Sequence, residues 1–423
     1  MVIGNFALVT LFGLVFYVGS CSAQPSKDEF NLFCRILWEV NYMIHGPEYV
    51  YDETKDAEIV KEMQVLYNAT TDDMGDFRKM LWERKDFFEK YPPPTDAKNR
   101  HVTHREIGQL LMEGEKKIKE NRELAEKVNQ KMEEAKLPAT KGMYGDNVKG
   151  VPKEDGDWTA ILNDNASIFG SASRAEDSCG NGEKTAGKTL INDLFCVCVG
   201  GEADNAEGPC HPKIWPPKSW KDNGGTGEWT QIKYGTGNLK RTRSFLESIE
   251  KIEKVCDTLL EEKDRTRNMP ALLDEYVKMI GKGDENVKKN KENKIFGHSG
   301  RSKERGEVKE CDGRQGSQSA EGSGKNNEKI CVDYTATLKQ HKEIPWHTKF
   351  REASDKMDQT KHLEEKILKN QADLLLLKNK AWIAYTREKE DDTANLDDMN
   401  MSHLFDATQP PPSFPLPHLL LIL

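Results

Sequence analysis

The chain has 423 residues, of which 31% are charged and 36% hydrophobic, and its formal net charge is -9 at pH 7. Such a composition describes a strongly hydrated protein with enough apolar residues for one elongated core or two compact ones. Lys and Arg are interleaved with Asp and Glu, so the chain lacks a sustained basic face that would follow nucleic acid phosphates. We therefore expect no nucleic acid partner.

The N-terminal segment, residues 1–23, is typical of a secretory signal peptide. An apolar block from Phe6 to Val18 is followed by small residues, so we expect cleavage before Gln24. The block is too short to span a membrane comfortably. Two alternatives stay open: a retained signal anchor, and acylation of Cys21, because the residues before it loosely resemble a bacterial lipoprotein site.

Export places the cysteines in an oxidising compartment, where thiols form disulfides. If residues 195–199 form a short strand, Cys196 and Cys198 point to opposite faces and should pair with different partners. A zinc site combining them with Cys210 and His211 lacks the usual paired spacing. The eight cysteines that remain after signal removal fit four disulfides of undetermined pairing: Cys34, Cys179, Cys196, Cys198, Cys210, Cys256, Cys311 and Cys331.

Three Asn-x-Ser/Thr triplets become candidate glycosylation sites once the chain enters the secretory route. They begin at Asn68, Asn165 and Asn400. We expect glycans at the first two, and the third is left open.

The first predicted helix follows Ser26, which forms a capping-box pattern with Glu29. A second helical stretch, from Asp52 to Tyr91, ends before three consecutive prolines because proline lacks the N–H donor that a helix needs. Together they supply a large part of the predicted apolar face: Phe30, Phe33, Leu37, Ile44, Val60, Met63, Tyr67, Phe77, Met80, Leu81, Phe87 and Phe88.

The next helix is predicted from a second capping-box pattern, Thr103 with Glu106. A row of mostly apolar residues, spaced alternately four and three apart, forms a seam along one face of this helix. Such a seam requires a partner helix, which we expect to be the preceding helical arm, residues 52–91, folded back antiparallel. Gly114 and Asn121 in this seam have two interpretations: they allow the two helix backbones to approach closely and fix the register of the helices, or they are tolerated irregularities. The seam comprises Ile107, Leu111, Gly114, Ile118, Asn121, Ala125, Val128, Met132 and Ala135.

Two further helical stretches are predicted, from Arg241 to Ile280, punctuated by Pro270, and from Ala353 to Glu390. Between the helices, residues 138–237 predict an irregular lobe rich in Gly, Pro and Cys, and residues 297–329 predict a flexible exposed loop. The expected fold class is mainly α: an elongated antiparallel helical hairpin or bundle with an irregular disulfide-stapled lobe, spanning residues 24–390.

Patterns associated with catalysis do not support an enzyme. Gly182 to Thr189 matches the phosphate-binding loop of nucleotide hydrolases, but no apolar run precedes it to form the strand that such a loop requires. His101 and His104 lack an acid at metalloprotease spacing, and the even cysteine count leaves no spare thiol. We expect no catalytic residue, metal, cofactor or nucleotide, and a solvated loop at residues 182–189.

Three segments carry a resemblance to a known family: Glu113 to Met132, Ala186 to Cys198, and Ile344 to His347. They resemble variant surface glycoproteins of African trypanosomes, closest to the congolense-type, B-like members, and the likeness runs from about Phe30 to Tyr385. It implies a long helical hairpin with a membrane-distal disulfide lobe, in a dense, antigenically variable coat that shields the cell from host antibodies. It also implies a homodimer or other homo-oligomer held by a glycosylphosphatidylinositol (GPI) anchor.

The C-terminus is interpreted as a short polar stalk, residues 391–405, followed by a lipid-anchor signal, residues 406–423. Asp406 begins a triplet of small residues that suits anchor attachment, but the apolar tail from Phe414 is short and broken by prolines. The expected location is the extracellular face of the plasma membrane. Two alternatives share the helical pattern: a surface receptor for a host protein, and a soluble secreted structural glycoprotein. Antibody epitopes are expected around residues 142–157 and 297–329.

Overall fold

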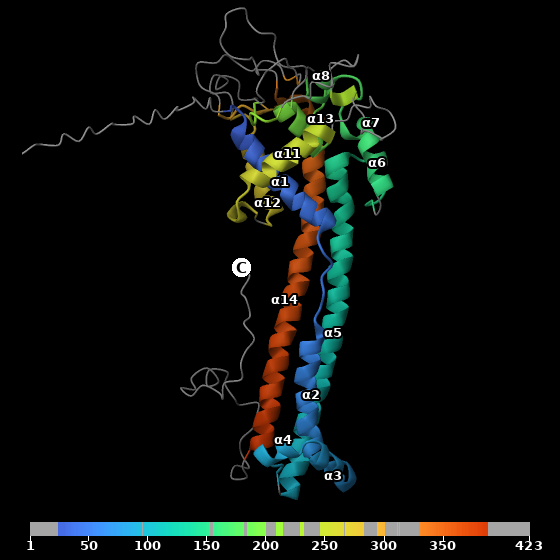
Figure 1. The fold of residues 1–423 in the computed structure, drawn as a ribbon, viewed down its shortest axis with the longest axis vertical. Helices are drawn as coiled ribbons and strands as arrows, with labels where there is room; N and C mark the ends of the chain where they lie inside the picture. Colours follow the sequence, from blue (N-terminus) through green and yellow to red (C-terminus); the bar gives the residue numbers. More distant parts are fainter. Residues whose placement is uncertain are drawn as a thin grey trace, which may run out of the picture. The chain divides into compact units, whose positions relative to one another are not determined.

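The structure is a computed structural model, and its described residues are mainly helical, as predicted (Figure 1). The predicted signal peptide, most of the 297–329 loop, Asn400, the stalk and Asp406 lie outside the described residues. These are 24–94, 96–152, 155–181, 184–199, 209–214, 229–231, 246–265, 267–282, 294–300, 311, 313 and 330–387.

The elements in chain order are α1 (Lys27–His45), α2 (Glu53–Ala69), α3 (Met74–Glu83), α4 (Lys85–Lys90), α5 (Ala97–Tyr144), α6 (Asp155–Asn163), α7 (Asn165–Ile168), α8 (Ala175–Ser178), α9 (Leu190–Leu194), η1 (Phe195–Val199), η2 (Trp229–Gln231), α11 (Leu246–Leu259), η3 (Glu262–Asp264), α12 (Met269–Met279), β1 (Ile295–Phe296), β2 (Val332–Asp333), α13 (Thr335–His341) and α14 (Pro345–Thr386). The strands β1 and β2 pair antiparallel, with Ile295 opposite Asp333.

The chain divides into two compact units. Unit 1 comprises residues 1–48 and 129–361, and unit 2 comprises residues 49–128 and 362–423. The helices α5 and α14 contribute residues to both units.

Unit 2 is built on α2, α5 and α14. The pairing of α2 with α5 is antiparallel, because Tyr67 stacks on His104 with ring centroids 3.9 Å apart while Glu53 forms an ion pair with Arg122. The predicted fold-back of the preceding arm is therefore confirmed. All nine seam positions of α5 are buried. The part of the seam in unit 2 faces α14 as well as α2, and this third helix was not predicted from the sequence as a partner.

Gly114 and Asn121 both have structural roles in the seam. A Cβ atom on Gly114 would lie 3.3 Å from Val60 and 3.4 Å from Leu374, so the glycine lets side chains of α2 and α14 approach α5 closely. The Asn121 side chain is fully buried between the same helices. The interpretation of these two residues as tolerated irregularities is thus wrong.

Asn121 is the centre of a polar layer that joins all three helices. Its amide nitrogen donates to Asp56 of α2 at 3.2 Å, and its amide oxygen accepts from Asn370 of α14 at 2.9 Å. Asp56 also accepts from the Tyr51 hydroxyl at 2.5 Å and from Gln371 at 3.4 Å. Because a shift of one helix would leave these buried polar groups unpaired, the layer specifies the register.

The predicted stretch from residue 52 to 91 consists of three helices rather than one. The Thr70 hydroxyl donates back to the Tyr67 carbonyl oxygen at 2.8 Å, where α2 ends. Asp73 then caps α3 by accepting from the Gly75 N–H at 2.7 Å. Side chains that compete for backbone groups in this way favour helix ends over helix interiors.

The capping-box prediction at Thr103 is wrong, because α5 begins at Ala97. Asp96 caps this earlier start by accepting from the Asn99 N–H at 2.9 Å. Thr103 lies inside the helix and donates to the Ala384 carbonyl oxygen at 3.5 Å, while Glu106 pairs with Arg387. Thr103 therefore serves a contact with α14, and Glu106 a contact with the residue that follows it.

At its other end α5 continues through Pro138 to Tyr144, so residues 138–144 are helical and not part of an irregular lobe. Proline inside a helix costs about 3 kcal/mol. Beyond it, Ala139 and Met143 are buried in the core of unit 1, and a Cβ atom on Gly142 would clash with Phe350. Burial of this segment offsets the cost of the proline.

The core of unit 1 contains a cluster of aromatic rings. Tyr276 of α12 stacks on Phe296 with centroids 4.0 Å apart, and it contacts Phe33 of α1 edge-on at 5.7 Å and Trp346 of α14 at 4.8 Å. The side chains of all four residues are fully buried. Residues far apart in sequence thus meet in one core.

The capping box predicted at the start of α1 is also wrong. The Ser26 hydroxyl oxygen accepts from the His298 N–H at 2.9 Å. Glu29 accepts from the Ser299 N–H at 2.7 Å and from its hydroxyl at 2.6 Å. The two side chains therefore clamp α1 to residues 298–300, a contact that replaces the local cap.

Candidate functional site

Four disulfides lie in unit 1, and each cysteine in them is buried. Residues 195–199 form a helical turn, so the predicted strand is wrong, although Cys196 and Cys198 do have different partners. The first disulfide joins α1 to α11 across a separation of 222 residues. The pairs are Cys34–Cys256, Cys179–Cys196, Cys198–Cys210 and Cys311–Cys331.

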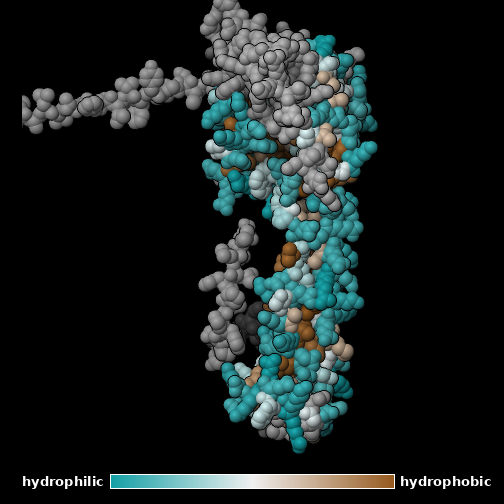
Figure 2. All heavy atoms as spheres, turned by 45° about the vertical axis from the view of Figure 1, so that its right-hand side comes forward, coloured by the Kyte–Doolittle hydropathy of each residue, from teal (hydrophilic) through white to brown (hydrophobic). Residues whose placement is uncertain are grey.

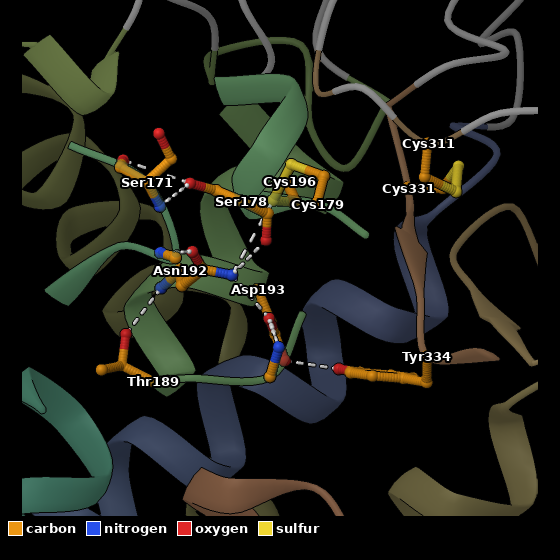
Figure 3. Close-up of a disulfide and its surroundings, with 12 residues drawn as sticks. Ser171, Ser178, Cys179, Thr189, Asn192, Asp193, Cys196, Cys311, Cys331 and Tyr334 are labelled. Carbon is orange, nitrogen blue, oxygen red and sulfur yellow. Dashed lines mark hydrogen bonds between the residues drawn. A yellow bond between two sulfur atoms is a disulfide. The ribbon is translucent and has the colours of Figure 1, made fainter. Parts of the chain in front are cut away.

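A fully buried carboxylate, Asp193, lies next to the Cys179–Cys196 disulfide (Figure 3). One of its oxygens accepts from the Tyr334 hydroxyl at 2.5 Å and from Trp346 Nε1 at 2.6 Å. The other accepts from the Gly187 N–H at 3.0 Å and from the Asn192 amide at 2.9 Å. We call this arrangement the Asp193 hub, because it ties α9 to Tyr334, which follows β2, to α14 and to the loop before α9.

Burial opposes the charge of the hub carboxylate, whereas its four donors favour it. Burial raises the pKa of Asp193 to about 6, despite the hydrogen bonds from Tyr334, Asn192, Trp346 and Gly187, which lower it. The tyrosine hydroxyl also shares a 2.6 Å hydrogen bond with Tyr276, which extends the network into the aromatic core. Asp193 was not predicted from the sequence, although an acidic residue inside the apolar run 190–199 is a signal that a buried partner exists.

Asn192 provides a second buried polar centre beside the hub (Figure 3). Its amide nitrogen donates to the Ser178 carbonyl oxygen at 2.9 Å, and its oxygen accepts from the Gly170 N–H at 3.0 Å. The Thr189 hydroxyl caps α9 by accepting from the Asn192 N–H at 3.0 Å. These bonds connect the residues around the Cys179–Cys196 disulfide to α9.

The described part of the phosphate-loop lookalike uses its polar groups to hold the chain together. Lys188 donates to the carbonyl oxygens of Ala166 and Phe169, and burial lowers the pKa of its amine. The Thr189 hydroxyl donates to the Ile168 carbonyl oxygen at 2.8 Å. Instead of a strand, the short helix α8 precedes this loop. The two side chains that would contact phosphate and magnesium in a nucleotide hydrolase are thus bonded to backbone carbonyls here.

His101 and His104 have separate roles on α5. His101 is exposed and lies 3.1 Å from a carboxylate oxygen of Asp72. His104 is half-buried against Tyr67, whose ring it stacks on. Among the described residues, no group of three or more His, Cys, Asp and Glu side chains is placed to hold a metal ion.

Asn68 and Asn165 differ in exposure. Asn68 is half-buried near the end of α2, and its amide oxygen accepts from Gln64 at 2.7 Å. Asn165 is 7% exposed, and its amide nitrogen, the atom that a glycan would occupy, donates to the Thr230 carbonyl oxygen at 3.0 Å. A glycan on this nitrogen would replace its buried hydrogen bond to Thr230.

Glu39 of α1 is a buried carboxylate, 5% exposed, that faces Arg267, Lys361 and Asp358. Burial raises its pKa to about 7, although the two cations lower it. A carboxylate with a raised folded pKa contributes stability that is fully present below the unfolded value, 4.5, and is lost as pH rises through about 7.

We expect Glu39→Gln to remove part of this pH dependence. The free energy of unfolding of the natural chain, measured by urea denaturation, should fall between pH 5 and pH 8 by about 1–2 kcal/mol more than that of the variant. Glu343→Gln serves as the control, because Thr348 and Arg351 lower the pKa of Glu343, so this carboxylate stays ionised from pH 5 to pH 8 and its replacement should leave the pH profile in this range unchanged. If the natural chain and Glu39→Gln have equal pH profiles, the raised pKa of Glu39 does not contribute to the pH dependence of stability.

The described residues define a mainly α, disulfide-bonded protein whose buried polar groups connect one element to another. None of its described helices is both long and apolar enough to cross a membrane.

Comparison with protein families matches residues 52–374 to the trypanosomal VSG domain. The match covers more than half of the chain, so the chain belongs to this family, and the predicted resemblance to variant surface glycoproteins is confirmed. The family is one of structural surface coat glycoproteins of trypanosomes. A search of curated proteins finds no match.

Proposed function

We propose that this chain is a non-catalytic, antigenically variable coat protein that shields the cell from host antibody and is held on the extracellular face of the plasma membrane by a GPI anchor. The observation that carries the proposal is the family match, which extends over elements of both units. The helices of unit 2 and the disulfides of unit 1 suit a rigid surface layer, because buried polar layers and covalent links restrict alternative arrangements.

Treatment of intact cells with a phosphatidylinositol-specific phospholipase tests the anchor. We expect the protein to be abundant on the surface and to appear in the supernatant after treatment. Retention on treated cells would contradict the lipid anchor. A scarce surface protein that retains a defined host protein in a serum pull-down would instead indicate a receptor.

Replacement of Asp406 by a bulky residue tests the attachment site, because anchor attachment requires a small residue. We expect Asp406→Trp to reduce surface display strongly, with Asp391→Trp in the predicted stalk as the matched control. Normal, phospholipase-sensitive display of Asp406→Trp would place the attachment elsewhere.

We propose self-association through exposed apolar residues of unit 2. Figure 2 shows a mostly hydrophilic face with hydrophobic residues exposed over the helices of this unit. Leu368 and Leu375, 63% and 48% exposed, are spaced so that they lie on one face of α14, and Met112 of α5 is 64% exposed. Exposed apolar residues gathered on one unit favour contact with a second copy.

We expect Leu368→Glu combined with Leu375→Glu to weaken self-association by at least about tenfold, since each leucine buried at an interface contributes roughly 1.5–3 kcal/mol. Light scattering of the phospholipase-released protein over a dilution series measures the change. Lys366→Glu, an exposed position on a different face of α14, is the control. An unchanged oligomer in the double variant would rule out this surface.

We propose that Asn68 carries a glycan and that Asn165 does not. Asn68→Gln is expected to remove the mass of one glycan from the secreted protein, as measured by gel shift and mass spectrometry with and without glycosidase. Asn165→Gln is expected to leave the glycan mass unchanged and to lower stability by about 1 kcal/mol, because its buried hydrogen bond to Thr230 is disturbed. A glycan found on Asn165 would contradict the burial argument.

A further inference from the structure

The first described residues of unit 1 form a turn whose backbone is held from several directions. The Ser26 N–H donates to the Pro209 carbonyl oxygen at 2.9 Å, and the Gly300 N–H donates to the Pro25 carbonyl oxygen at 2.8 Å. The clamp of Ser26 and Glu29 on residues 298–300 is built directly on this turn. The chain is therefore fixed in place from its second mature residue onward.

Gln24 stands immediately before this fixed turn. Its carbonyl oxygen accepts from the Lys27 N–H at 3.3 Å, which closes the turn that leads into α1, and the residue is partly exposed. Cleavage after Ala23 would give Gln24 a free α-amine next to its own side-chain amide. An N-terminal glutamine can close on itself, because the amine nitrogen reaches Cδ of the same residue.

We propose that Gln24 of the exported protein is converted to pyroglutamate, an inference that rests on the export and signal cleavage that are part of the proposed function. The α-amine nitrogen forms a bond to Cδ, the bond between Cδ and Nε2 breaks, and Nε2 leaves as ammonia with one proton taken from the amine. The reaction is an internal amide exchange, so it consumes no oxidant, reductant or second substrate.

The geometry of the turn accommodates the product. Ring closure takes place within one residue and joins only atoms of Gln24. The Gln24 carbonyl oxygen is not consumed and keeps its hydrogen bond from Lys27. The modified end lacks both the charge and the amine, which changes its electrostatics and removes the group that aminopeptidases bind. Exoproteolytic removal of Pro25 and Ser26, and with them the clamp, is thereby blocked.

Mass spectrometry of the N-terminal peptide from the full-length surface protein tests the proposal. We expect a peptide that begins at residue 24 and is lighter than the encoded sequence by the mass of one ammonia. An isotope-labelled synthetic peptide with an open Gln24, added at cell lysis, measures cyclisation during handling. A cyclised fraction no higher in the protein than in this peptide overturns the proposal and leaves signal cleavage intact.

A matched variant separates the modification from the position of cleavage. Gln24→Ala is expected to keep an open amine and to lose residue 24 to an added aminopeptidase of the kind that cleaves before proline, which Pro25 requires, whereas the natural chain resists. Equal trimming of both chains overturns the proposal. A natural chain that begins at any residue other than 24 overturns both the cleavage site and the modification, while surface display is still decided separately by phospholipase release.

Discussion

Replacing Asp193 by alanine is expected to lower the free energy of unfolding by about 3–5 kcal/mol. The carboxylate accepts four hydrogen bonds in a fully buried site, from a phenol, an indole, a backbone amide and a side-chain amide. Its removal leaves the Trp346 and Gly187 N–H groups without their acceptor, and each buried unpaired donor costs about 1–3 kcal/mol. A small cavity adds to this loss.

Urea denaturation of the purified protein at pH 7.5 measures the effect. Asp146→Ala is the matched control in the same unit, because Asp146 has an exposed side chain and forms a surface ion pair with Lys349. A surface pair contributes about 0–1 kcal/mol, so this control should unfold close to the natural chain. If both variants lose the same small amount, the Asp193 hub does not hold α9 to Tyr334 and α14.

Removal of the Cys34–Cys256 disulfide is expected to produce the second large loss, about 5 kcal/mol. The bond closes a loop of 222 residues, and cross-linking of distant residues restricts the unfolded chain most strongly. Both cysteines are replaced by alanine in one variant, which avoids a free thiol. Denaturation under non-reducing conditions measures the loss.

The comparison variant removes Cys198–Cys210, which closes a loop of only 12 residues. The same chain-entropy argument gives a loss of about 3 kcal/mol for this loop. A larger loss in the free energy of unfolding on removal of Cys34–Cys256 would show that this disulfide stabilises the protein by restricting the unfolded chain. Equal losses would show that local packing of the two sulfur atoms in the folded state dominates instead.

Helical periodicity predicted the largest part of the fold. The seam of α5 is buried at all nine positions, and the arm before the three prolines does fold back against it. Local polar patterns were less reliable: the capping boxes at Ser26 and Thr103 are both used in contacts with distant segments. A capping hydrogen bond and a buried tertiary hydrogen bond each contribute about 1 kcal/mol to stability, so a tertiary contact can replace the local cap.

The polar centres were only partly visible in the sequence. Asn121 was recognised as unusual within an apolar seam, but its partners Asp56 and Asn370 come from two other helices. Asp193 and Glu39 were not singled out at all, because the burial of an acidic residue depends on which elements pack around it. The pKa values of these two carboxylates are raised by that packing.

The sequence by itself determined the helical class, the break at the three consecutive prolines and the family, because spacing and composition act over short distances along the chain. The tertiary structure decided the disulfide pairing, the partners of Asp193 and the continuation of α5 through Pro138. Each of these depends on residues that are far apart in sequence, where burial outweighs local preference. The same packing holds the backbone that follows Gln24, the residue for which we propose cyclisation.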